Sequence, residues 1–257
     1  MIAIRELEVA FGPRVVAHVP ELEIARGQIV GLAGESGSGK SMTALAILGL
    51  ARLAGARVRG SIALDGRELL ELSDRELRHV RGRRIAMIMQ SPRAALNPTL
   101  RLGQLFERTL RLHGVPRAEL RARTVDGMQS VLLEPALLDR YPHEISGGQA
   151  QRFAIALALA LHADVLLADE PTSALDVTVQ AEVVGLLQRV RDERGTAMLF
   201  ISHDLAVIGE LADRIVVMRR GEVVETGATL DVLLEPKAAY TRELIAAVPR
   251  IGSGAAT

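Results

Sequence analysis

The sequence of 257 residues contains no cysteine, and aromatic residues make up only 2% of it. The absence of cysteine excludes disulfides, thiolate metal sites and iron–sulfur clusters, and it suits a reducing compartment. Because aromatic side chains are so scarce, we expect aliphatic packing to build the core. Hydrophobic residues account for 49% of the chain and charged residues for 24%, which is typical of a globular protein.

An excess of charge of one sign is also missing, since 31 basic residues balance 31 acidic ones. This balance argues against nucleic acid as a partner, because binding through a positive field needs a basic excess. The longest apolar run, Phe153 to Leu161, is shorter than the roughly 20 residues of a membrane-spanning helix. The first residues, Met1 to Glu6, lack the order of a signal peptide. We therefore expect no segment that crosses a membrane.

Short aliphatic runs alternate with helical patterns, and this order predicts an α/β fold with a central, largely parallel sheet. Buried strands are expected at Ile29–Ala33, Ile85–Met89, Val165–Ala168, Met198–Ile201 and Ile215–Met218. Helices are expected at Met42–Leu50, Gly103–Leu112, Gln149–Leu161, Val179–Glu193 and Leu205–Leu211.

The beginning and the middle of the chain differ from this core pattern. Ile2–Ala10, Glu21–Ala25 and Arg59–Leu64 alternate more, which predicts a small antiparallel sheet. Residues 91–141 are punctuated by proline and helical in pattern, which indicates an inserted helical subdomain. We therefore expect one domain over residues 1–250. Its core and β-subdomain comprise 1–90 and 160–250, its helical subdomain comprises 91–159, and a disordered tail follows at 251–257.

Residues 34–41 match the phosphate-loop pattern G-x-x-x-x-G-K-[ST], with an expected strand before them and a helix after. Glycines let backbone N–H groups curl around phosphate oxygens, and the helix N-terminus adds partial positive charge. Lys40 is expected to reach the β- and γ-phosphates, and Ser41 to bind Mg²⁺. The alternative is a glycine-rich turn with a chance lysine. The residues expected to contact the nucleotide here are Gly34, Glu35, Ser36, Gly37, Ser38, Gly39, Lys40, Ser41 and Met42.

The strand expected at Val165–Ala168 is followed directly by two carboxylates, Asp169 and Glu170. In phosphate-loop enzymes an acidic residue at such a strand end holds Mg²⁺. The next residue can polarise an attacking water as a general base. We assign Asp169 to the metal and Glu170 to the water, and the alternative is a pair that caps the loop before Pro171.

The run Ile145-Ser146-Gly147-Gly148-Gln149 resembles the L-S-G-G-Q signature of ABC (ATP-binding cassette) ATPases. The order of the other motifs also resembles this family. The resemblance implies that Gln90 touches Mg²⁺ and senses the γ-phosphate, that His203 contacts the γ-phosphate and that Phe11 stacks on adenine. It also implies a D-loop, which contacts the partner subunit, at Ser173–Asp176. In this family Ser146, Gly147, Gly148, Gln149 and Asp176 complete the ATP site of a partner subunit.

The chain is thus identified as similar to ABC ATPases from about residue 2 to residue 245. This resemblance implies a P-loop NTPase (RecA-like) core with an N-terminal antiparallel β-subdomain and an inserted α-helical subdomain. It implies ATP hydrolysis with ATP and Mg²⁺ as cofactors. It further implies a second ATPase subunit, two integral membrane permease subunits and, indirectly, an extracytoplasmic substrate-binding protein. The expected location is the cytoplasmic face of the inner membrane.

The stretch Ile85 to Pro98 closely resembles the ATPases of peptide and nickel importers (the Opp/Dpp/Nik group). In this group the groove beside Gln90 receives a short coupling helix of the permease, and residues 91–105 are the expected contact surface. Peptide-importing members carry a P-H-P-Y-T-like run and a cysteine-bearing extension. Here Pro236 to Thr241 is a loose match and cysteine is absent, which favours the nickel branch. An efflux ATPase and a non-transport ABC ATPase remain alternatives.

Some conspicuous side chains receive no functional assignment. A basic cluster that runs from Arg75 to Arg84 is interpreted as a solvated helix end. We expect Met87 and Met89 to belong to the core rather than to a metal site. The histidines other than His203 show no metal-ligand spacing.

Overall fold

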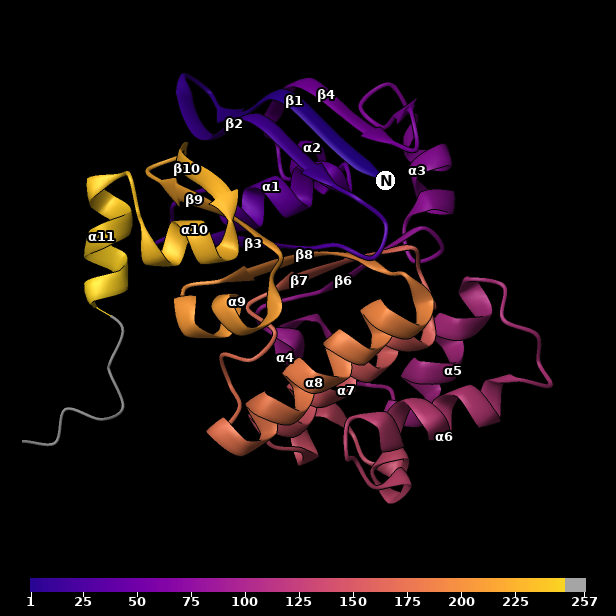
Figure 1. The fold of residues 1–257 in the computed structure, drawn as a ribbon. Coiled ribbons are helices and arrows are strands. Elements are labelled where there is room, and N and C mark those ends of the chain that lie inside the picture. Colours follow the sequence, from indigo (N-terminus) through magenta and orange to yellow (C-terminus); the bar gives the residue numbers. More distant parts are fainter. Residues whose placement is uncertain (248–257) are drawn as a thin grey trace, which may run out of the picture.

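The computed structural model describes residues 1–247; residues 248–257, and with them the tail expected at 251–257, lie outside this range. Within the described part, one sheet of ten strands runs in the order β5-β4-β1-β2-β10-β9-β3-β8-β7-β6 (Figure 1). Its parallel half consists of β3 (Ile29–Ala33), β6 (Ile85–Ile88), β7 (Val165–Asp169), β8 (Ala197–Ser202) and β9 (Arg214–Arg219). The predicted parallel core is therefore confirmed, with strand ends that shift by one residue.

The antiparallel half of the sheet is formed by β1 (Ile2–Phe11), β2 (Arg14–Ile24), β4 (Arg57–Leu64) and β5 (Arg67–Glu68). It was predicted as a separate small sheet, whereas the structure joins it to the parallel half through β10 (Glu222–Ala228). β10 pairs antiparallel with β9, and Glu222 bridges to His18 of β2. The sequence analysis missed β10, because its alternate side chains are exposed and it carries no dense aliphatic run.

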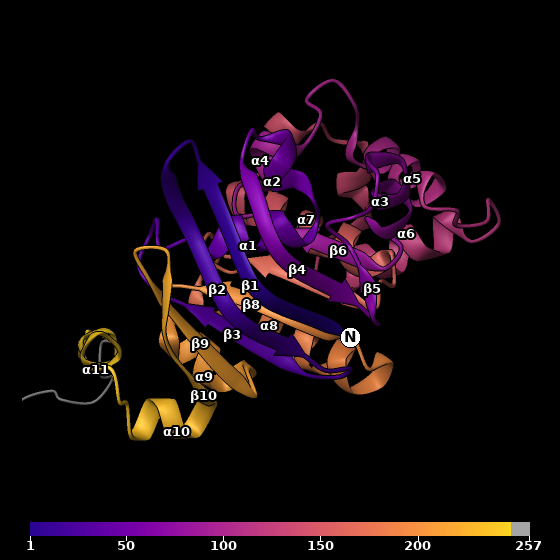
Figure 2. The same ribbon diagram turned by 90° about the horizontal axis from the view of Figure 1, so that it is seen from above.

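Helices cover both faces of the parallel strands, as Figures 1 and 2 show. Four of the expected helices begin one or two residues earlier than predicted, since α1 starts at Lys40, α5 at Leu102, α7 at Gly147 and α8 at Val177. The α-helices are α1 (Lys40–Ile47), α2 (Leu50–Leu53), α3 (Asp74–Val80), α4 (Pro92–Ala95), α5 (Leu102–Leu112), α6 (Leu120–Ser130), α7 (Gly147–Ala160), α8 (Val177–Arg194), α9 (Leu205–Leu211), α10 (Thr229–Leu234) and α11 (Ala239–Ala246).

Two apolar clusters fill the molecule, one on each side of the parallel strands. One lies between these strands, α1 and the antiparallel sheet; the other lies among the strands and helices α5 to α9. The expectation of an aliphatic core is incomplete, because Phe106, Phe153 and Phe200 are among the largest fully buried side chains. The rings of Phe106 and Phe153 meet edge to face, with centroids 5.7 Å apart. Aromatic residues are scarce in this chain, but these three lie in the interior, where a large ring buries the most apolar area.

The basic cluster from Arg75 to Arg84 begins on a helix, as expected, but three of its members, Arg78, Arg81 and Arg84, pair with aspartates. Ser73 and Glu76 form a capping box that starts α3. Arg81 pairs with Asp74 of the same segment at 2.8 Å. Arg84 bridges Asp65, after β4, and Asp164, before β7. Arg84 therefore connects the β-subdomain to the parallel core.

No helix in the described residues 1–247 is long and apolar enough to cross a bilayer.

Candidate functional site

The phosphate loop leaves the carboxyl end of β3 and runs into α1. All three of its glycines have positive φ values, +147° at Gly34, +78° at Gly37 and +103° at Gly39. A Cβ at Gly34 would lie 2.1 Å from the carbonyl oxygen of Met218, and one at Gly39 would lie 2.6 Å from that of Val16. β9 and β2 therefore press on the loop so closely that only glycine fits at these positions.

Lys40 closes the loop from inside. Its Nζ donates to the carbonyl oxygens of Gly34 and Glu35, both at 2.8 Å, and to Ser38 Oγ at 3.3 Å. Only 6% of the residue is exposed. Burial lowers the pKa of Lys40, and the charges of Glu170, Asp169 and Glu35 oppose that shift. The ammonium group thus lies in the hollow of the loop, where the pattern places phosphate oxygens.

Asp169 ends β7 beside this loop and is 4% exposed. Its Oδ1 is buried and has no hydrogen-bond partner. Burial raises the pKa of Asp169, while the Ser41 hydroxyl works against this rise. Ser41, Gln90 and Asp169 line one cavity of about 340 Å³. A partnerless carboxylate oxygen beside a hydroxyl and an amide is an oxygen donor set that suits Mg²⁺, so the predicted metal residues fit the ion.

Glu170 and His203 meet at the carboxyl ends of β7 and β8. The Nδ1 of His203 lies 2.9 Å and 2.8 Å from the two carboxylate oxygens of Glu170. The backbone N–H of His203 donates to the same carboxylate at 3.1 Å. Glu170 has a φ of +49° and is 6% exposed. Left-handed backbone at a residue other than glycine is uncommon and concentrates at active sites.

The signature residues lie in a second group, at the start of α7. Ser146 Oγ accepts the N–H of Gln149 at 3.2 Å, and Gln149 Oε1 accepts the N–H of Ser146 at 2.9 Å. Gly147 faces open space, and a Cβ at Gly148 would lie 3.4 Å from the carbonyl oxygen of Ala174. Among the described residues that line the 340 Å³ cavity, none belongs to this motif. The signature therefore contributes nothing to the cavity that Ser41, Gln90 and Asp169 line.

The two remaining predicted contacts lie on the edges of the site. Asp176 caps α8, because its Oδ1 accepts the N–H of Val179 at 3.0 Å. Phe11 ends β1 and is 37% exposed. It lies on the hairpin whose second strand carries Val16 against Gly39. An exposed ring at this place remains available for stacking.

The prediction that Met87 and Met89 are core residues is wrong for Met89. β6 ends at Ile88, and Met89 is 46% exposed. Both methionines line the cavity at Gln90 and also a second, apolar cavity of about 220 Å³ between α4, α5 and α7. Flexible thioether side chains therefore lie between the metal residues and an open apolar groove.

Two contacts to the motifs could not be found from the sequence. The hydroxyl of Tyr240 accepts the backbone N–H of Glu35 at 2.9 Å, across 205 positions of the chain. The guanidinium of Arg93 donates to the carbonyl oxygen of Ile145 at 2.6 Å, directly before the signature serine. Both residues lie in runs that resemble importer ATPases, but those runs do not indicate these contacts, so only the fold reveals them.

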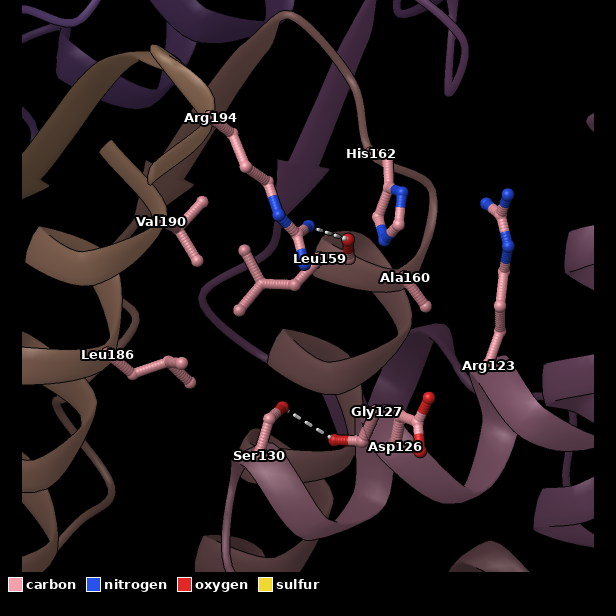
Figure 3. A pocket seen from close by; sticks show the side chains of 10 residues that line it. All are labelled: Arg123, Asp126, Gly127, Ser130, Leu159, Ala160, His162, Leu186, Val190 and Arg194. Carbon is pink, nitrogen blue, oxygen red and sulfur yellow. Dashed lines mark hydrogen bonds between the residues drawn. The ribbon is translucent and has the colours of Figure 1, made fainter. Parts of the chain in front are cut away.

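A further cavity, of about 270 Å³, lies between α6, α7 and α8 (Figure 3). Two of its polar side chains bond to nearby backbone, since Ser130 Oγ donates to the Gly127 carbonyl and Arg194 to the Leu159 carbonyl. Arg123 is held by Glu119 at 2.7 Å. No predicted site residue is among the described residues that line it, so it lies outside the nucleotide site.

Comparison with known proteins identifies this arrangement of loop, acidic strand end and signature. Residues 18–173 match the family described as ABC transporter. The chain belongs to this family and is an ATP-hydrolysing cassette of it. This confirms the predicted P-loop fold and ATP as the nucleotide.

The chain resembles several named ATP-binding proteins. It is 46% identical to the probable D,D-dipeptide transport ATP-binding protein DdpD of Escherichia coli, over 90% of this chain and 72% of that one. It is 46% identical to the peptidoglycan transport ATP-binding protein YejF of Agrobacterium fabrum, over 97% of this chain. It is 44% identical to the glutathione import ATP-binding protein GsiA of Salmonella typhimurium, over 90% of this chain. The chain spans only 47% of YejF and 39% of GsiA.

A solved structure agrees with the fold over nearly its whole length. The ATP-binding cassette MJ0796, in a dimeric post-hydrolysis state bound to ADP and phosphate, superposes with a TM-score of 0.80. The identity is 28%, and the match covers 89% of this chain and 99% of that one.

Proposed function

We propose that this chain is the ATP-hydrolysing subunit of an importer that takes up small peptides or nickel ions through a separate permease. One observation carries the motor assignment. Three features lie together at the carboxyl edge of one parallel sheet: Lys40 in its loop, Asp169 with its partnerless Oδ1, and the Glu170–His203 pair. Ligands of open α/β sheets bind at this edge.

In the proposed reaction, loop N–H groups and Lys40 hold the ATP phosphates. Ser41, Gln90 and Asp169 are the residues that would hold Mg²⁺, which neutralises phosphate charge when bound. Glu170 accepts the proton of the water that attacks the γ-phosphorus, and the bond to the β-phosphate oxygen breaks to leave ADP and phosphate. His203 keeps the Glu170 carboxylate in place and reaches the γ-phosphate.

The proposal requires a second cassette, identical or different. The signature residues do not line the cavity of Ser41, Gln90 and Asp169, and Gly147 faces open space. Val177, directly after Asp176, is 82% exposed. The related cassette MJ0796 was solved as a dimer. We propose that two cassettes pack head to tail, so that each signature covers the ATP bound by its partner.

Replacing Gly147 by Glu should abolish ATP-dependent dimerisation and leave ATP binding by the monomer unchanged. A Cβ at Gly147 meets nothing within 4 Å, so the substitution leaves the monomer intact but sets a negative charge against the partner's phosphates. Sedimentation of a Glu170→Gln background with ATP measures the dimer. Gly185→Glu, on α8, is the matched control. A normal dimer with Gly147→Glu would refute the head-to-tail arrangement.

The proposed permease contact is the apolar groove beside Gln90. Its cavity of about 220 Å³ is lined, among others, by Met87, Met89, Pro92, Ala95 and Leu96. An open apolar groove that begins at the metal residues is suited to a short helix of a membrane subunit. We place this contact within residues 91–105, with two permease subunits and, through them, a substrate-binding protein. The cassette would then lie at the cytoplasmic face of the inner membrane.

The names of the relatives bear on the cargo of the proposed importer. The relatives described above are named for peptidoglycan, a D,D-dipeptide and glutathione, which favours peptide-like compounds. The preference for nickel, drawn from the loose match at Pro236 to Thr241 and the absence of cysteine, stays a prediction. Whichever the cargo, the residues that would bind it belong to other subunits.

In source cells, Glu170→Gln should abolish uptake of the cargo, because the motor no longer completes its cycle. Uptake of a labelled dipeptide and of labelled nickel is measured against the wild type, with Glu193→Gln on the exposed face of α8 as control. Loss of dipeptide uptake alone assigns peptides, and loss of nickel uptake alone assigns nickel. If neither changes, the importer assignment fails and an efflux system becomes the leading interpretation.

A further inference from the structure

Helix α11 lies at one side of the molecule, apart from the helices that cover the parallel strands (Figures 1 and 2). Tyr240 and Thr241 are its buried residues. Tyr240 is 7% exposed although it belongs to a peripheral helix. This ring therefore links α11 to the body of the protein, together with Thr241 and the packing of Leu244 and Ile245 on the core.

The ring of Tyr240 ends at the phosphate loop. Its hydroxyl accepts the backbone N–H of Glu35 at 2.9 Å. The guanidinium of Arg219 lies 4.5 Å from the ring centroid, close enough for a cation–π contact. Arg219 directly follows Met218, whose carbonyl oxygen leaves room only for glycine at position 34. Tyr240 and the end of β9 thus hold the first two residues of the loop.

The start of α11 is anchored independently. Both carboxylate oxygens of Glu225, on β10, accept backbone N–H groups, from Lys237 at 2.7 Å and from Ala238 at 3.0 Å. These bonds fix the segment that leads into Tyr240. The position of the ring beside Glu35 is consequently restrained by two strands. Arg219 of β9 contacts the ring, and Glu225 of β10 holds the segment before it.

We infer that Tyr240 is a positioning residue of the phosphate loop and that the docking of α11 is linked to nucleotide binding. This inference rests on the proposed ATPase function. The loop binds phosphate through backbone N–H groups that must all point at the phosphate oxygens. Restraining its first residues therefore lowers the conformational entropy that the loop loses when nucleotide binds. Linkage then requires that bound nucleotide strengthens the docking of α11 by the same factor.

Replacing Tyr240 by Phe should weaken ATP binding about three- to tenfold and leave kcat at saturating ATP nearly unchanged, because one hydrogen bond of ordinary strength is lost. The phenyl ring keeps the packing and the contact with Arg219. Isothermal titration with ATP and steady-state kinetics measure the two effects. The chain has two tyrosines, and Tyr141→Phe, which keeps the stacking on His143, is the matched control.

Hydrogen exchange of residues 239–246 supplies a second readout that ordinary packing would not produce. A non-hydrolysable ATP analogue should raise amide protection there in the wild type and clearly less in Tyr240→Phe. Wild-type ATP affinity in Tyr240→Phe, or protection of α11 that ignores the nucleotide, would overturn the inference. If the wild-type protein bound no ATP, the proposed function itself would fail, and that result is distinguishable from both.

Discussion

Glu170→Gln should bind ATP as the wild type does but hydrolyse it about 10²–10⁴-fold more slowly, the usual contribution of a general base. Glutamine has nearly the same shape, and its amide oxygen can still accept the N–H of His203 that lies 3.1 Å from Glu170. The backbone at φ +49° is unaffected. The change therefore removes the proton acceptor and keeps the geometry of the site.

Phosphate release and ATP binding by the purified chain measure this prediction. Without hydrolysis the variant should accumulate as a closed, ATP-bound dimer, because ATP shifts the equilibrium through its extra contacts in that state. The control Glu193→Gln should hydrolyse ATP normally. Wild-type turnover in Glu170→Gln would remove Glu170 from the role of general base and leave the water without an assigned acceptor.

Lys40→Ala should weaken ATP binding itself, by about 10- to 100-fold, since hydrogen bonds to charged groups contribute about 1.5–3 kcal/mol. Lys40 occupies the hollow of the loop with three local acceptors, and burial lowers its pKa. The folded chain thus holds a desolvated charge next to uncharged oxygens. Phosphate would supply a negatively charged hydrogen-bond acceptor, which none of these three groups is.

Titration with a fluorescent ATP analogue measures the affinity, and thermal unfolding without nucleotide shows whether the loop still folds. The chain has one other lysine, Lys237. Its backbone N–H contacts Glu225, so Lys237→Ala keeps that bond and provides a matched loss of one positive charge. Equal ATP affinity in the two variants would contradict the phosphate-loop assignment.

The local patterns predicted the central elements well. The strand–loop–helix unit from Ile29 to Ile47 was found because the strand, the glycines and the helix are contiguous, and each is determined by nearby residues. The helix beginning at Lys40 instead of Met42 shows that helix ends depend on the tertiary position of the loop. β10 escaped prediction, since half of its residues face solvent and its pairing with β9 and β2 is long-range.

The burial of single side chains was harder to predict. The sequence pattern predicted Met89 as the last residue of a strand. In the structure β6 ends one position earlier, and the exposed Met89 side chain lines a groove. Aromatic residues are scarce in the sequence, yet the rings of Phe106 and Phe153 contact each other in the interior. Composition says how many aromatic residues exist and not where the packing of helices α5 and α7 places them.

By itself, the sequence determined the type of fold and the nucleotide, and it predicted the residues that would carry the chemistry, because phosphate loops and acidic strand ends are short motifs with local geometry. Only the tertiary structure decided which of these residues share a site. It brought Asp169 beside Ser41, tied Glu170 to His203 and Glu35 to Tyr240, and left the signature of α7 out of the cavity that Ser41 and Asp169 line. The reason is physical: parallel strands gather distant loops at one edge, and no local pattern encodes which loops become neighbours.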